Sequence, residues 1–127
     1  MPRPFKNLVK DGVISLYVQI TGPRTYRIIK MALDTGASYT IIPLETAIAI
    51  GYNPVLSRKR IEITTASGVV IVPVIKIKSI TCLGKEIKNI EVICHDLPSQ
   101  SPVKGLLGLN FLIHFAPFRK FLNEISV

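Results

Sequence analysis

The stretch Met31-Ala32-Leu33-Asp34-Thr35-Gly36-Ala37-Ser38 decides the fold of this chain. In it an ionisable aspartate ends an apolar run and is followed directly by a small hydroxyl residue and a glycine. The apolar run predicts a buried strand, and Gly36 lets the backbone turn sharply and bring N–H groups up to the carboxylate. Asp-Thr-Gly is also ordinary turn chemistry, so the tripeptide alone leaves a plain structural turn open.

Short strand-like runs surround this segment on both sides. Residues 13–20 and 26–33 flank a Thr-Gly-Pro-Arg turn and predict a hairpin, because both are rich in β-branched and aromatic side chains. A short strand at 40–42 and a two-turn helix at 43–50 follow, with Pro43 expected at the first helical position and Gly51 ending the helix. Further runs predict strands at 61–65, 69–80 and 87–94, a short apolar helix at 105–115, and a closing strand at 121–127. This pattern predicts a mostly β fold, a small closed or folded-over β barrel.

Length, composition and charge limit the possible classes of protein. A chain of 127 residues suits one domain, and we expect it to span residues 1–127 with its core at about 13–115. With 48% apolar and 19% charged residues, the composition excludes a disordered chain. The net charge of +8 leaves open a basic β-barrel that binds nucleic acid. The basic residues are scattered, however, and aromatic residues do not interleave with them, so nucleic acid is not expected as a partner.

The two cysteines, Cys82 and Cys94, fit neither a disulfide framework nor a zinc-ligand spacing, even with His95 beside Cys94. We expect two small buried side chains, no metal site and no cofactor. Residues 1–11 lack the apolar segment of a signal peptide, and the longest apolar run, at 69–75, is far shorter than the ~20 residues of a membrane helix. A cytoplasmic protein with no membrane partner is therefore predicted.

The Asp34 segment and two later elements together resemble the retropepsin-like group of single-domain aspartic proteases. Ala66-Ser67-Gly68 follows Asp34 by about thirty residues, where that family has the glycine turn of a β-hairpin flap. Leu106-Leu107-Gly108 matches the family's apolar-apolar-glycine element before a helix. The elements occur in the family's order, and the resemblance implies an acid-protease barrel with a short C-terminal helix and aspartic endopeptidase activity.

The resemblance also implies roles for individual residues. Asp34 is implied to be the catalytic carboxylate. The residues implied to support the active-site loop are Thr35, Gly36 and Ala37, with the Thr35 hydroxyl bonding the partner loop. The residues implied to contact an extended peptide or protein substrate are Ser38, Ala66, Ser67 and Gly68, the last three at the tip of a flap that excludes water. The Leu106-Leu107-Gly108 element is implied to be supporting core beneath the active-site loop.

The chemistry of this family requires a second carboxylate. One carboxylate deprotonates a water while the other, protonated, polarises the scissile carbonyl, and two like charges so close cannot both ionise. Asp11 and Asp96 lack a following Thr-Gly, so neither is a second copy of the Asp34 loop. The sequence therefore predicts a symmetric homodimer in which each subunit supplies one Asp34.

Two departures from the family pattern concern the subunit contact. Leu109-Asn110 follows Gly108, where retroviral relatives often have an arginine and then an acidic residue or asparagine. Two prolines within residues 1–7 and the Arg119-Lys120 pair interrupt the terminal segments from which many relatives build their dimer. A catalytically weak or inactive module of the same fold, used for peptide binding or dimerisation, therefore stays open beside the protease.

Overall fold

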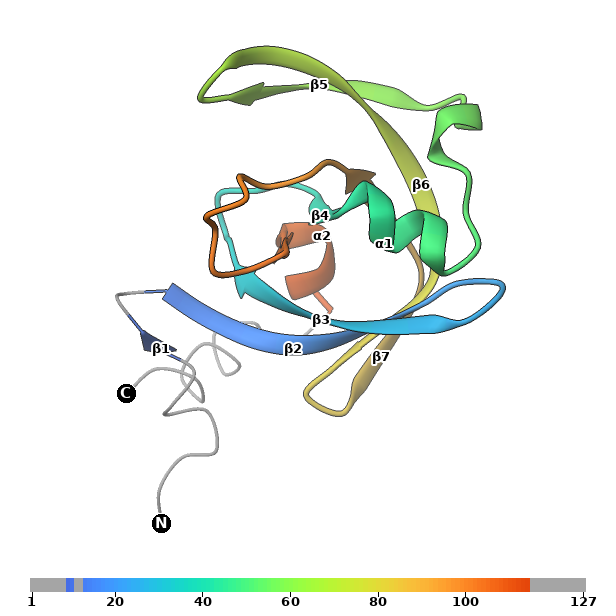
Figure 1. Ribbon diagram of the computed structural model, residues 1–127. Helices are drawn as coiled ribbons and strands as arrows, with labels where there is room; N and C mark the ends of the chain where they lie inside the picture. Colours follow the sequence, from blue (N-terminus) through green and yellow to red (C-terminus); the bar gives the residue numbers. More distant parts are fainter. Residues whose placement is uncertain (1–8, 11–12, 115–127) are drawn as a thin grey trace.

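Strands make up most of the computed structural model, which describes residues 9–10 and 13–114 (Figure 1). The strands are β1 (Val9–Lys10), β2 (Val13–Thr21), β3 (Tyr26–Leu33), β4 (Thr40–Ile42), β5 (Arg60–Thr65), β6 (Gly68–Cys82), β7 (Lys85–Cys94) and β8 (Gly105–Leu107). The helices are α1 (Leu44–Ala49), the 3-10 helix η2 (Pro54–Leu56) and α2 (Leu109–Leu112). The predicted mostly β fold class is confirmed.

Six strands form a closed circuit of paired neighbours. The sheet order is β1-β2-β3-β8-β4-β7-β6-β5, and β2 pairs with β6 in addition to β3. β8 runs parallel to β3 and antiparallel to β4, and β4 runs parallel to β7. The β5–β6 hairpin extends beyond this circuit and arches over the side on which the loop between β3 and β4 lies (Figure 1).

The core lies inside this circuit because every second side chain along the strands points inward. Along β2, Leu16, Val18 and Ile20 are buried while the residues between them face outward, as expected when successive side chains point to opposite faces. α2 adds Phe111 and Leu112, both fully buried, to the same cluster. Each such burial stabilises the fold by about 1.5–3 kcal/mol, so the strands and the end of α2 are fixed together.

The prediction of one apolar helix at 105–115 is wrong. Residues 105–107 form β8, and the helix α2 is only the four residues Leu109–Leu112. A Cβ atom at Gly105 would come within 3.0 Å of the Met31 side chain and closer still to the Ile41 carbonyl oxygen, so glycine permits the tight passage between β3 and β4. Apolar character alone does not separate a central strand from a buried helix. Residue 115 and the predicted strand at 121–127 lie outside the described residues.

The other predicted elements are confirmed with small shifts of their ends. Pro43 stands at the N-cap of α1, one position before the first helical residue where it was predicted, and its carbonyl accepts the Ala47 N–H at 3.2 Å. α1 ends before Gly51 as expected. No helix in the described part of the chain is long and apolar enough to cross a membrane.

Candidate active site

Asp34 lies directly after β3, at the point where β3 runs beside β8. Its N–H donates to the Leu107 carbonyl at 2.9 Å, so the pairing of the two strands continues up to the aspartate. The Gly36 N–H donates to Oδ1 of Asp34 at 2.9 Å, and the Ala37 N–H donates to the Asp34 carbonyl at 3.2 Å. The loop therefore folds around the half-buried carboxylate and holds one of its oxygens. Within the described residues the other oxygen, Oδ2, has no hydrogen-bond partner, and since no buried side-chain oxygen there lacks one, Oδ2 lies at the surface.

The next residues form the outward edge of this loop. Thr35, Gly36 and Ser38 are exposed, and Ala37 is half-buried. A Cβ atom at Gly36 would lie 3.2 Å from Oδ1 of Asp34, which is tight, so glycine here keeps the carboxylate close to the backbone. The edge that the resemblance assigns to a second subunit and to substrate is thus on the surface of the chain.

The start of α2 supports the Asp34 loop through backbone hydrogen bonds. The Leu109 N–H donates to the Ala37 carbonyl at 2.8 Å, and the Asn110 N–H donates to the Ser38 carbonyl at 3.2 Å. A Cβ atom at Gly108 would lie 2.8 Å from the Ala37 carbonyl oxygen and even nearer the Tyr39 carbonyl. Only glycine fits there, which gives a physical reason for the apolar-apolar-glycine element.

Sequence reasoning missed the part that Asn110 and Thr40 play in this support. Oδ1 of Asn110 accepts the Thr40 N–H at 2.9 Å and the Thr40 hydroxyl at 3.0 Å, and its Nδ2 donates to the Glu91 carbonyl at 2.6 Å. The Thr40 hydroxyl in turn accepts the Gly108 N–H at 3.1 Å. The signal available in the sequence was a lone asparagine in an otherwise apolar helix, which needs partners when it is covered.

Ala66 and Ser67, two of the residues expected at the tip of a flap, form the turn of the β5–β6 hairpin. The Thr65 hydroxyl donates to the Gly68 carbonyl at 2.9 Å and accepts the Ser67 N–H at 3.2 Å. Gly68 has φ 120°, a backbone conformation that other residues rarely adopt, with open space where a Cβ would be. The three tip residues are exposed. One face of the hairpin packs in a small cluster with the segment after Asp34: Ile61, Ile63, Val70 and Val72 with Tyr39 and Ile41.

An exposed ion pair lies at the base of the β5–β6 hairpin. Nζ of Lys59, the residue before β5, lies 3.0 and 2.9 Å from the two carboxylate oxygens of Glu91 on β7. The hydrogen bond to Glu91 is the main cause that raises the pKa of Lys59, and Tyr39 adds to it. The Lys59 carbonyl also accepts the Val74 N–H at 2.9 Å, which closes the base of the hairpin.

The other aspartate and the cysteines that the structure describes cap a helix or lie in the core. Oδ1 of Asp96 accepts the Leu44 N–H at 3.0 Å and so caps α1, while Asp11 lies outside the described residues. Cys82 and Cys94 are buried free thiols, and burial raises the pKa of each to about 12. Within the described residues no three His, Cys, Asp or Glu side chains gather as a metal site would require.

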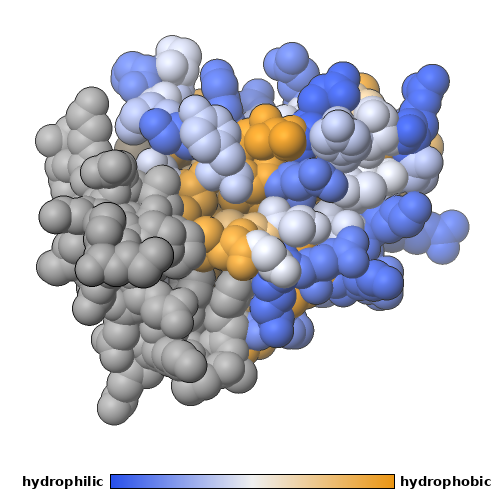
Figure 2. Space-filling model, turned by 90° about the horizontal axis from the view of Figure 1, so that it is seen from below, coloured by the Kyte–Doolittle hydropathy of each residue, from blue (hydrophilic) through white to orange (hydrophobic). Residues whose placement is uncertain are grey.

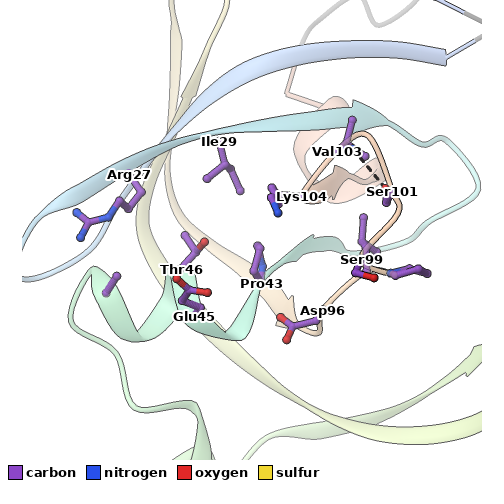
Figure 3. Close-up of a pocket in the computed structure, with 13 residues that line it drawn as sticks. Arg27, Ile29, Pro43, Glu45, Thr46, Asp96, Ser99, Ser101, Val103 and Lys104 are labelled. Atoms are coloured by element: carbon purple, nitrogen blue, oxygen red, sulfur yellow. Dashed lines mark hydrogen bonds between the residues drawn. The ribbon is translucent and has the colours of Figure 1, made fainter.

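A cavity of about 440 Å³ lies away from Asp34, between β3, α1 and the loop that leads to β8 (Figure 3). Its charged lining residues are of both signs: Arg27, Lys104, Glu45 and Asp96. Neither Asp34 nor the flap tip contributes to it. This cavity is therefore separate from the candidate site.

Comparison with known proteins identifies the family. The profile of the family described as "gag-polyprotein putative aspartyl protease" matches residues 18–114. The structure is similar to the crystal structure of a retropepsin-like aspartic protease from Rickettsia conorii, with a TM-score of 0.64 and 27% identity over 84% of this chain and 74% of that one. No curated protein matches the chain. Because the profile spans most of the sequence and includes Asp34, the chain belongs to this retroviral-type aspartyl protease family and has the retropepsin-like fold.

Proposed function

We propose that this chain is an aspartic endopeptidase whose active site is completed by a second copy of itself. The observation that carries the proposal is the state of the Asp34 carboxylate: one oxygen is held by the Gly36 N–H and the other is open at an exposed loop edge. The chain offers one such carboxylate, while the chemistry of the family needs two. A two-fold axis through the loop edge would supply the second.

In the proposed reaction, the two Asp34 carboxylates share one proton. The ionised one takes a proton from a water, whose oxygen attacks the peptide carbonyl carbon, while the protonated one donates a hydrogen bond to the carbonyl oxygen. The tetrahedral intermediate then breaks its C–N bond, and a proton passes to the leaving amine.

The neighbouring residues are proposed to hold and cover the substrate. Gly36 fixes the carboxylate, Ala37 receives support from α2, and the exposed Thr35 hydroxyl reaches the loop of the other subunit. Ser38 and the flap tip, residues 66–68, contact an extended peptide that pairs as a strand between flap and floor. Closure of the flap would exclude water from the dyad. The free thiols of Cys82 and Cys94 support action in a reducing compartment such as the cytoplasm.

The test is a cleavage assay on an unfolded protein, with the wild type beside Asp34→Asn at several pH values and protein concentrations. We expect Asp34→Asn to lose at least about 100-fold in rate, because the amide can act neither as base nor as shared-proton acid. Wild-type activity should rise faster than linearly with protein concentration, peak in acid and be blocked by a statine-type transition-state mimic.

Two outcomes would contradict the proposal. Cleavage that persists in Asp34→Asn would place the activity elsewhere. Peptide binding without cleavage, unchanged by Asp34→Asn, would favour the inactive binding module. Sedimentation at several salt concentrations completes the test, since a charge of +8 per subunit should weaken the dimer at low salt.

A further inference from the structure

The outer face of the sheet formed by β3, β2, β6 and β7 brings together residues that are distant in sequence. Tyr26 pairs with Thr21, Thr21 with Ser79, and Ser79 with Lys88, which makes one continuous row across the four strands. The next row runs Ile28, Gln19, Thr81, Glu86 in the same way. Since paired side chains on one face are neighbours, these rows belong to one face, which we call the β2 face and in which Ser79 is buried.

An aromatic and apolar strip runs along this face. Tyr17 is 70% exposed, Tyr26 51% and Ile28 58%. Tyr17 pairs with Lys30, so Ile28 is its diagonal neighbour, and Tyr26 follows two residues away on the same side of β3. Figure 2 shows the molecule from this side, with hydrophobic side chains in the middle and hydrophilic ones beside them. Two tyrosine rings are therefore presented to solvent on either side of an isoleucine.

Lysines border the strip. Lys30 lies opposite Tyr17, and Lys78 and Lys88 line a shallow hollow of about 540 Å³ at the other end of the rows. The pairing of β6 with β7 skips Lys78 and Asn89, and the Lys78 N–H bonds to the Tyr52 hydroxyl at 2.8 Å instead. Glu86 is the single acidic residue that lines the hollow, and within the described residues none of the three lysines is in an ion pair.

We propose that the β2 face binds single-stranded nucleic acid, with bases stacked on Tyr17 and Tyr26 and phosphates on Lys30, Lys78 and Lys88. Exposed aromatic rings on a sheet flanked by cations suit unpaired bases, whose flat faces a duplex would hide. The net charge of +8 favours a polyanion. A second copy of the chain would place three lysines against three lysines, so this partner is disfavoured. The proposal is independent of the protease activity, because the face does not include Asp34.

The test measures anisotropy of a fluorescein-labelled 12-mer of deoxythymidine with the full chain at several salt concentrations. We expect saturable binding, with a log–log salt slope of about −2 for three phosphate contacts. Tyr17→Ala and Tyr26→Ala should each weaken binding about tenfold, and Tyr17→Phe should keep most of it. Lys88→Ala should reduce the salt slope by about 0.7.

Matched controls separate this face from general basicity. Lys104→Ala removes a lysine that lines the cavity beside α1, and Leu56→Ala removes an exposed apolar side chain on η2; neither should change binding. A 12-residue polyglutamate and a 12-base-pair duplex should bind more weakly than the single strand. The proposal would be overturned by absence of binding, by equal binding of polyglutamate, by tyrosine variants that bind like wild type, or by self-association through Tyr17 and Tyr26 in sedimentation. Circular dichroism of each variant excludes unfolding as the cause.

Discussion

The Asp34 loop and the β5–β6 hairpin, which is the proposed flap, face the same side of the molecule but are built by opposite means (Figure 1). The loop donates a hydrogen bond to β8 and accepts two from the start of α2, and both elements are remote in sequence. Among the residues that the structure describes, the hydrogen bonds of the hairpin tip come from the hairpin itself, through the Thr65 hydroxyl and the pairing of β5 with β6. In the proposed protease the carboxylate needs a fixed position, whereas a flap has to open and close, and the two bonding patterns fit these needs.

Two glycines, one beside the Asp34 loop and one in the hairpin, are required for different physical reasons. At Gly108 no side chain fits, because the Ala37 and Tyr39 carbonyls occupy the space. At Gly68 the space is open, and glycine is favoured by the positive φ of 120°. Packing determines the residue in the loop region, while backbone conformation determines it in the flap.

The largest expected effect is a loss of stability when the core side chain of α2, the helix that supports the Asp34 loop, is removed. Phe111→Ala should lower the free energy of unfolding by about 3–5 kcal/mol, because it empties a fully buried site in the main core. Ile71→Ala, on the exposed face of the flap, should change it by no more than about 0.5 kcal/mol. Urea denaturation measures both. Equal effects would show that flap and core are equally packed; Phe111→Leu, which keeps more volume, should lie between them.

The buried thiols should make the core sensitive to alkaline pH. The pKa of both Cys82 and Cys94 is raised from 9.0 to about 12, so their contribution is complete below pH 9 and is lost as pH rises toward 12. Each thiol should lower the free energy of unfolding by up to about 1.4 kcal/mol per pH unit in that window. Denaturation in reductant between pH 8 and 11 measures the slope. Replacing both cysteines by alanine should flatten it, and an unchanged slope would assign the effect to other groups, such as Tyr52.

Asn110→Ala tests the hydrogen bonds by which Asn110 of α2 holds Thr40, at the end of the Asp34 loop. It leaves the Thr40 N–H and hydroxyl and the Glu91 carbonyl without their partner, which should lower the free energy of unfolding by about 1–3 kcal/mol. For the proposed protease, kcat should also fall because the loop is displaced. The matched control is Asn53→Ala, an exposed asparagine whose side chain makes no capping bond. Because Thr40 and Asn110 share bonds, their effects in a double-mutant cycle with Thr40→Val should be non-additive. Additive effects would contradict a shared supporting role of Thr40 and Asn110.

The smallest expected effect is on the flap tip. Thr65→Val removes the hydroxyl that organises the turn, and because the bonds are exposed it should cost only about 0.5–1 kcal/mol. For the proposed protease, KM should rise roughly two- to fivefold with little change in kcat. Thr64→Val, one residue earlier on the exposed face, is the control. A fall in kcat as large as that of Asn110→Ala would show that the flap positions the reacting groups.

Much of the fold follows from local patterns in the sequence. Alternating β-branched residues predict β2, β3, β5, β6 and β7, and the run before Asp34 predicts the loop that carries the family resemblance. The segment 105–107 could not be predicted, because an apolar tripeptide is compatible with a strand or a helix until Gly105 is seen against Ile41. The same holds for Asn110, whose partners Thr40 and Glu91 are 70 and 19 residues away.

The sequence by itself therefore determined β2 to β7, the Asp34 loop and the presence of one such carboxylate per chain, because these depend on neighbouring residues and on counting. The tertiary structure alone decided what supports the loop and which residues share a face. Tyr26 and Lys88 lie in one row only because four strands pair in one register. Strand register is set by the packing of the whole core, and local sequence does not contain it.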